Sequence, residues 1–243
     1  MSAAGLDALV AVELLKLRRS LAFVLCLVAP TAVALLGFLI AVDKSRGVDW
    51  SMYLTSGVAI WGYFMLPMTV TALTLLLAQM EHGPKAWNHL LALPIARPKL
   101  FAAKLLTAFG LVAAMTFGLL PLLAAGGVAA RWVEPAVGLP GAPDLAGALP
   151  LLGRIAGGAL LMTVIQLWVA LRFASFVPPL VLGIGGTLVA VAATSARQGI
   201  YFPWLLPVNA LGTADRADIA LQVGGVGGLL AAAAMLVDLS RAR

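Results

Sequence analysis

The side chains that could carry chemistry are few in this chain of 243 residues, and none falls into a catalytic or metal-binding pattern. His82 and His89 are seven positions apart, unlike the i, i+4 pair of a His-Glu-x-x-His zinc site, and no third ligand accompanies them. The single cysteine, Cys26, lies inside an apolar run, without a disulfide partner or the setting of a nucleophile. The sequence therefore predicts no catalytic, cofactor-binding or metal site.

The most informative polar segment runs from Gln79 to Lys99 and contains both histidines. Pro84 suits the first turn of a helix and Pro94 ends one, so the segment predicts a helix of about ten residues between them. One face of that helix is apolar: Trp87, Leu90, Leu91 and Pro94. Such a helix lies along a membrane surface and joins two spans, or it docks into a groove of a partner protein. The pattern alone leaves both readings open.

A second notable segment, Tyr201 to Leu211, is rich in aromatic residues and proline. Its distinctive members are Tyr201, Phe202, Pro203, Trp204 and Pro207. Composition alone favours an aromatic belt at a membrane interface.

Uncharged polar groups inside the apolar runs are rare. Gln166 and three threonines that follow Pro67 either line a path or bond neighbouring helices; the threonines are Thr69, Thr71 and Thr74. No charged residue is placed at the middle of an apolar run, which argues against a proton-coupled or ion-coupled carrier.

These residues must be positioned by membrane helices, because 62% of the chain is hydrophobic and only 11% is charged. A soluble domain of this size needs more charge to cover its surface. Six apolar runs are long enough to span a bilayer: about 21–42, 53–79, 100–125, 149–171, 173–194 and 219–239. The first is too long for a cleavable signal peptide. We expect an all-α integral membrane protein with a single transmembrane domain over residues 1–243.

The charges indicate the orientation. With the N-terminus inside, the cytoplasmic connections carry ten bases: Lys16, Arg18, Arg19, Lys85, Arg97, Lys99, Lys104, Arg172, Arg241 and Arg243. They carry only four acids, Asp7, Glu13, Glu81 and Asp238, whereas the opposite side has six bases and six acids. The surplus of +6 thus falls on one side, which predicts cytoplasmic termini, a cytoplasmic segment 80–99 and an external loop 195–218. Bases placed at the ends of spans indicate contact with the lipid bilayer and not with nucleic acid.

Pairs of small residues also recur at or near one-turn spacing, and the pair Gly224 and Gly228 lies in the last run. Such faces allow helices to approach closely, within one subunit or between two.

The segment from Glu81 to Arg97, followed by Lys104, resembles the cytoplasmic loop of type-two ABC exporter permeases. In that loop an acidic residue precedes a short helix ending in Leu-Leu-x-x-Pro-x-x-Arg, and a lysine opens the next span. The opening Glu13-Leu14-Leu15-Lys16-Leu17-Arg18-Arg19 is similar to that family's entry into its first span. The stretch from Tyr201 to Pro207 resembles an external segment of the subgroup that exports, or gives immunity to, lantibiotics and related peptides.

The resemblance implies a permease in the bacterial cytoplasmic (inner) membrane that works with a separate P-loop ABC ATPase, which binds the ATP and Mg. A second copy of the chain, or a related permease, completes the transporter. The chain itself has no Gly-x-x-x-x-Gly-Lys-Ser/Thr loop. Residues implied to dock the ATPase through a coupling helix are Glu81, His82, Trp87, Leu90, Leu91, Pro94, Arg97 and Lys104. Tyr201, Phe202, Pro203, Trp204 and Pro207 are implied to form an external gate.

The alternative from another functional class is a membrane scaffold or assembly factor for envelope or cofactor maturation, with no transport of its own. The two hypotheses differ in whether the segment from Glu81 to Arg97 binds an ATPase. No residue indicates the substrate, and the direction of transport rests on the resemblance.

Overall fold

The computed structural model describes residues 5–43, 49–84, 86–135 and 138–242. Four bases counted above, Lys44, Arg46, Lys85 and Arg243, lie outside these ranges. The described part of the chain is helical and contains no β-strand, so the predicted all-α class is confirmed.

Within the described ranges, five helices are long and apolar enough to cross a membrane, judged by length and composition. The first three are α2 (Leu21–Val42), a continuous helix from Trp50 to His82, and α6 (Arg97–Val133). The fourth and fifth are α7 (Leu145–Arg172) and a helix formed by α10 (Ala214–Leu221), η4 (Gln222–Val226) and α11 (Gly227–Ala242). The remaining predicted span, residues 173–194, corresponds to α8 (Val177–Ala193), which has only 17 residues.

The continuous helix from Trp50 to His82 consists of three parts. They are α3 (Trp50–Ile60), the π-helical segment η1 (Trp61–Met65) and α4 (Leu66–His82). Asp49 caps its first turn by accepting a hydrogen bond of 2.7 Å from the Met52 amide. This cap explains why the helix starts before the predicted residue 53. Asp144 caps α7 in the same way, through the Gly147 amide at 2.9 Å.

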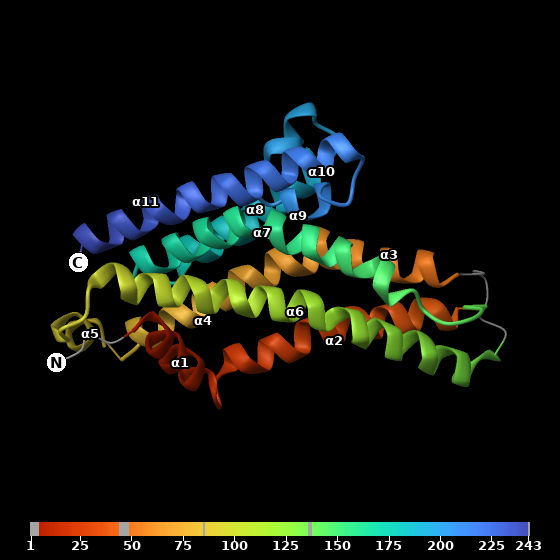
Figure 1. Ribbon diagram of the computed structural model, residues 1–243, viewed down its shortest axis with the longest axis horizontal. Helices are drawn as coiled ribbons and strands as arrows, with labels where there is room; N and C mark the ends of the chain where they lie inside the picture. Colours follow the sequence, from red (N-terminus) through yellow and green to blue (C-terminus); the bar gives the residue numbers. More distant parts are fainter. Residues whose placement is uncertain (1–4, 44–48, 85, 136–137, 243) are drawn as a thin grey trace.

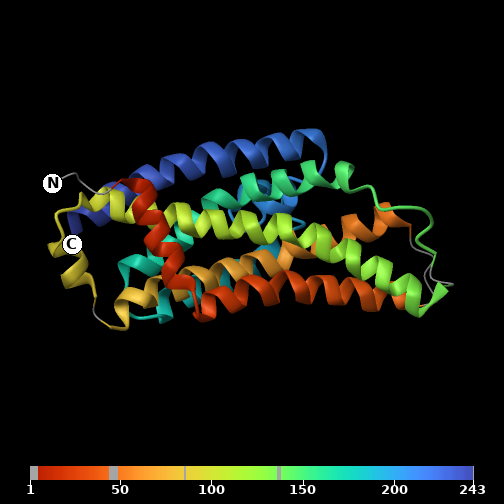
Figure 2. The same cartoon turned by 60° about the horizontal axis from the view of Figure 1, so that its bottom comes forward.

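The helices lie side by side in an elongated bundle (Figure 1). Helix α1 (Leu6–Leu17), helix α5 (Trp87–Ala92) and both chain termini lie at one end, which we call the α5 end (Figures 1 and 2). Helix α6 runs along the bundle and contacts α1, α2, α7 and α11. Its Leu119 and Leu123 are fully buried, so α6 supplies much of the core.

Helix α5 is shorter than predicted. It has six residues instead of about ten, because a turn precedes it in which the Ala86 amide donates to the Glu81 carbonyl at 2.9 Å. Pro84 lies in that turn and not in the helix, so its predicted role as a first-turn residue is wrong. Pro94 does follow the helix end.

Helices α7 and α11 run in the same direction. Gly158 in α7 opposes Gly224 so closely that a Cβ on Gly224 would be 2.7 Å from the Gly158 Cα. Further along both helices, the Arg172 Nε lies 3.8 Å from an Asp238 carboxylate oxygen. Because both helices end at the α5 end, the chain between them must return along the bundle. Helix α8 makes most of that return.

Candidate functional site

Four charged side chains from three helices meet at the α5 end. Lys16 Nζ of α1 lies 2.6 Å from Glu13 Oε1 and 2.9 Å from Glu81 Oε1 at the end of α4. Lys104 Nζ of α6 lies 2.8 Å from Glu13 Oε2 and 2.7 Å from Glu81 Oε2. The four residues therefore form a closed ring of alternating charge with no net charge, which we call the charge ring.

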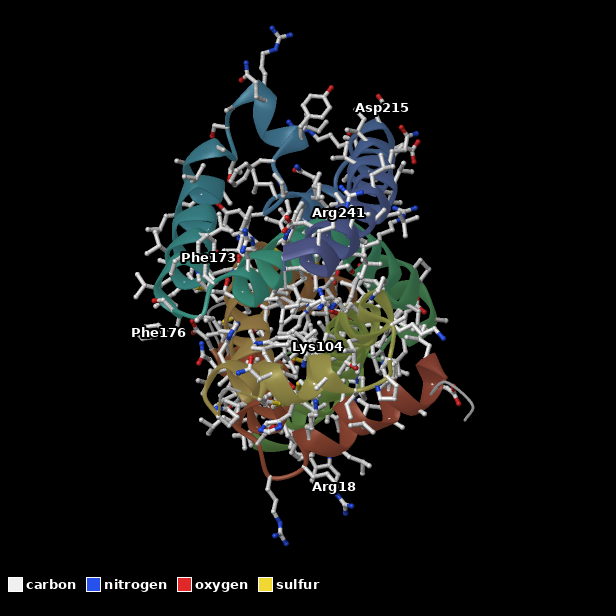
Figure 3. The ribbon with its side chains drawn as sticks, turned by 90° about the vertical axis from the view of Figure 1, so that its left-hand side faces the viewer. Arg18, Lys104, Phe173, Phe176, Asp215 and Arg241 are labelled. Carbon is white, nitrogen blue, oxygen red and sulfur yellow. The ribbon has the colours of Figure 1, made fainter. Side chains whose placement is uncertain are left out.

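The charge ring is largely removed from solvent. The side chains of Lys104 and Glu81 are 3% and 2% exposed, and that of Glu13 is 10% exposed. In Figure 3, which looks onto the α5 end, Lys104 lies within the bundle. Lys16 is the most accessible member, at 29% exposed. Ionised groups removed from water are expensive unless each is paired, so loss of one buried member leaves its partners with uncompensated charge.

The ionisation of the α1 members shows how pairing outweighs burial. Burial alone would raise the pKa of Glu13, but the charge of Lys104 and the hydrogen bonds from Lys104 and Lys16 lower it below its ordinary value. Burial alone would lower the pKa of Lys16, but hydrogen bonds to Glu13 and Glu81 raise it. Both groups are therefore held in their charged forms.

The sequence of α1 explains its attachment to the bundle. Leu9, Glu13 and Leu17 recur every four residues and are the buried positions of this helix. Glu13 thus occupies the middle of an otherwise apolar face, where it requires a cationic partner. The sequence patterns alone assign Glu13 and Lys16 to no site. The detectable signal was an acid at an inward-facing position of an amphipathic helix.

A second set of contacts holds the turn before α5. The Trp87 Nε1 donates a hydrogen bond of 3.1 Å to His82 Nδ1, and His82 Nε2 lies 3.2 Å from the Ala170 carbonyl oxygen in α7. These contacts fit a neutral imidazole with its proton on Nε2. The Trp87 ring also packs against Phe101 at 5.7 Å, and Lys104 Nζ lies 5.9 Å from the Trp87 ring centre.

The structure brings some of the predicted docking residues together inside the protein and leaves others on its surface. Glu81, Trp87 and Lys104 are buried, and His82 is partly buried. Leu90 and Leu91 are half-buried, whereas Pro94 and Arg97 are exposed. The accessible face of the segment consists of Asn88, His89, Ala92, Leu93 and Pro94, with Leu91 at its edge. Trp87 therefore anchors α5 and does not project from it.

The second predicted site, residues 201–207, begins at the surface and enters the bundle. Tyr201 is 58% exposed, whereas Trp204 is 4% exposed and Leu206 is fully buried. The Phe202 and Trp204 rings stack at 5.7 Å. Helix α9 (Leu206–Asn209) follows, and a Cβ on Gly158, in the middle of α7, would lie 2.9 Å from the Leu206 carbonyl oxygen. This depth is more than a surface belt would reach.

Both described π-helical segments lie against this buried stretch, because α9 contacts both η1 and η4. Segments of this kind are rare and recur at functional sites. Trp204 Nε1 is buried and has no hydrogen-bond acceptor among the described residues. A buried donor without a partner is uncommon in a stable arrangement.

Three of the four polar residues considered for a path form structural hydrogen bonds, although Gln166 Oε1 is buried and has no hydrogen-bond partner among the described residues. Gln166 Nε2 donates to the Pro179 carbonyl at 2.6 Å and so joins α7 to α8. Thr71 and Thr74 donate to carbonyls of their own helix, at 2.9 Å and 2.8 Å. Among the described residues, no group of three or more His, Cys, Asp or Glu side chains is arranged to hold a metal ion.

Comparison with known proteins gives one match. A family model described as "ABC-2 family transporter protein" matches residues 9–190, which is well over half of the chain. The match includes the charge ring and α5 but ends before the buried stretch around Trp204. No curated protein and no solved structure matches the chain significantly.

Proposed function

Because the chain belongs to the ABC-2 family of transporter proteins, we propose that it is the permease subunit of an exporter driven by a separate P-loop ATPase. The family accounts for a multi-pass membrane protein that acts as a permease. The proposal extends this to six spans in a bacterial inner membrane, cytoplasmic termini, and a second permease subunit, either identical or related. ATP and Mg belong to the ATPase.

The observation that carries the coupling proposal is the charge ring. It ties α1, the end of α4 and the start of α6 together at the base of the loop that carries α5. Movement of a loosely attached loop would not be transmitted to the membrane helices. A push on α5 is instead transmitted to α4, α6 and α7, through the ring and through the bonds from Trp87 to His82 and from His82 to Ala170.

The docking surface in this proposal is the accessible face of residues 88–94. Leu91 and Leu93 supply its apolar contacts, and Leu93 is 47% exposed. A cavity of about 400 Å³ lies beside it, lined by Lys16, Met80, Glu81, Ala86 and Leu90. Solvent-accessible apolar side chains next to a concave surface are typical of protein docking sites.

At the opposite side of the transporter, the buried stretch from Phe202 to Ala210 would form the external gate. Its short helix and turns are covered by protein, as non-helical backbone at membrane depth must be. An outward shift of this stretch would give the Trp204 indole access to an acceptor. The proposed cargo is an amphipathic peptide or antibiotic, by resemblance to the immunity subgroup.

The test is purification of the tagged permease from its native membrane in mild detergent, followed by identification of bound proteins and an assay of ATP hydrolysis. We expect a stoichiometric P-loop ATPase that is lost in Leu91→Asp and Leu93→Asp. The matched control is Ser175→Asp, which adds the same charge to another connection at the α5 end. Ser175 already accepts a hydrogen bond from the Val177 amide, so aspartate fits there.

A clean preparation without an ATPase would favour the scaffold alternative. Retention of the ATPase by both leucine variants would place docking elsewhere on the α5 end and overturn the assignment of the docking surface.

A further inference from the structure

A groove on the outside of the bundle lies between α1, α2 and α6, away from the proposed docking and gate sites. Its upper part is a cavity of about 800 Å³ lined by Leu14, Leu17, Arg18, Arg19, Phe23 and Leu111. Its lower part is an apolar cavity of about 440 Å³, which Phe23 and Leu111 also line. The two cavities therefore form one continuous groove.

Helix α6 presents small residues along the floor of the groove. Gly118 lines the lower cavity, and a Cβ on Gly118 or on Gly110 would meet no atom within 4 Å. Pro30 and Pro121, one from each helix, also line it. The floor is therefore open and apolar along α6 from Leu111 to Leu122.

The length of the groove matches one leaflet of a membrane. Leu122 lies eleven positions after Leu111 in the helix, a rise of about 16 Å. The hydrocarbon core of a bilayer is about 30 Å thick, so half of it is about 15 Å. An acyl chain lying along the groove would thus contact the protein through the whole hydrocarbon thickness of one leaflet.

The mouth of the groove is basic. Arg18 and Arg19 lie between α1 and α2, and among the described residues neither forms an ion pair with an acid. Arg19 has φ +64, a left-handed conformation uncommon for residues with a side chain, and it turns the chain sharply between the two helices. The nearest acid of α1, Glu13, is already held by Lys104 and Lys16. The Arg18 side chain extends from the edge of the bundle (Figure 3).

We propose that this groove binds an anionic phospholipid, with its phosphate at Arg18 and Arg19 and an acyl chain between α2 and α6. Paired arginines suit a phosphate because each presents several N–H donors in a planar fork. Basic pockets between membrane helices at the cytoplasmic side hold anionic headgroups in the same way. The inference uses the proposed orientation only to place the lipid in the cytoplasmic leaflet, and it is independent of ATPase docking.

The experiment uses the purified, delipidated full-length protein in an uncharged detergent. Its melting temperature is measured with added phosphatidylglycerol, phosphatidylcholine or inorganic phosphate, and the lipids it retains are identified by native mass spectrometry. We expect phosphatidylglycerol to raise the melting temperature by several degrees more than phosphatidylcholine, because a ligand that binds only the folded state stabilises it. Inorganic phosphate alone should have no such effect, because it cannot occupy the apolar part.

Two variants test the two parts of the groove. Arg18→Gln combined with Arg19→Asn removes the charges, and asparagine tolerates the left-handed backbone. Gly118→Leu fills the apolar floor. Both should abolish the preference for phosphatidylglycerol. The matched controls are Arg197→Gln, an exposed arginine far along the chain, and Gly185→Leu, whose added side chain also enters open space.

Equal stabilisation by both lipids, or a phosphatidylglycerol preference that survives both groove variants, would overturn the proposal. Stabilisation by phosphate alone would reduce the site to an anion site. A lipid-independent dimer that is lost in Gly118→Leu would identify the groove as a contact between two copies. None of these readings depends on an ATPase, so they leave the proposed function to its own test.

Discussion

Lys104 is the residue on which the charge ring depends most, because it is 3% exposed and contacts both carboxylates. Lys104→Met should destabilise the protein by about 3–5 kcal/mol, because it leaves two buried carboxylates with only Lys16. Adding Glu81→Leu should restore most of the loss, since the remaining Glu13 and Lys16 form a neutral pair. The measurement is the unfolding transition of the purified protein in detergent for the two single variants and the double variant.

The control for this cycle is Asp7→Asn, which removes an exposed acid from the same helix as Glu13. It should change stability by less than about 1 kcal/mol. If the stability losses of the two single variants simply add in the double variant, Lys104 and Glu81 are not coupled. We expect coupling because Lys104 Nζ lies 2.7 Å from Glu81 Oε2.

The loss of folding stability at low pH should depend on Glu13. Its pKa is lower in the folded protein than the ordinary value of 4.5, so its stabilising contribution is complete above pH 4.5 and is lost as the pH falls through the folded pKa. Lys16 has the opposite sign, because its pKa is raised above 10.5. Its contribution is complete below pH 10.5 and is lost as the pH rises through the folded value.

Melting temperature measured against pH should therefore fall at both extremes and stay level between them as far as these two groups are concerned. Glu13→Gln should weaken the fall in acid. If the melting temperature of that variant falls at low pH as much as that of the unmodified protein, other carboxylates cause the loss of stability.

Among the helices, η4 approaches α7 so closely that two adjacent glycines should differ in their tolerance of a side chain. A Cβ on Gly224 would be 2.7 Å from the Gly158 Cα, whereas a Cβ on Gly225 would meet nothing within 4 Å. Gly224→Ala should lower the melting temperature and loosen α9, which also packs against Gly158. Gly225→Ala should be neutral or stabilising by up to about 1 kcal/mol, because alanine favours a helix. Equal effects of the two variants would contradict this packing.

The sequence predicted the helices well where local rules apply. Hydropathy located α2 at its observed bounds, and the other long helices extend past the predicted spans partly because Asp49 and Asp144 cap them earlier. Prediction failed where several helices must meet. The role of Glu13 depends on Lys104, which lies 91 residues away, and no periodicity within α1 identifies that partner.

The same limit explains why the sequence could not place individual side chains in the two candidate sites. Helical spacing grouped Trp87 with Leu91 on one apolar face, but it could not separate an inward anchor from an accessible side chain. Trp87 turns inward because Phe101 and His82 provide a packing surface and an acceptor. Composition favoured a surface belt around Trp204, whereas Gly158 and Gly186 make room for this stretch inside the bundle.

Across the whole molecule, the parallel directions of α7 and α11 determine the path of the chain between them, which includes α8. Helices α7 and α11 both end at the α5 end, as the Gly158–Gly224 and Arg172–Asp238 contacts require, so residues 173–213 must return to the far end. Helix α8 covers only about 26 Å with its 17 residues, slightly less than the hydrocarbon thickness of about 30 Å. The proposed crossing by α8 would therefore require short flanking segments to complete it.

Cysteine labelling tests this crossing directly. In a Cys26→Ala background, Thr213→Cys should react with a membrane-impermeant maleimide in intact cells, whereas Ser175→Cys should react only after permeabilisation. Ser51→Cys lies at the start of the long helix from Trp50 to His82, and Asn88→Cys lies in α5, just beyond its other end. They mark the proposed external and cytoplasmic sides. If Thr213→Cys behaves like Asn88→Cys, α8 does not cross. If the labelling of all four cysteine variants is inverted, α8 still crosses the membrane. The charge surplus would then face outward, which the positive-inside rule opposes.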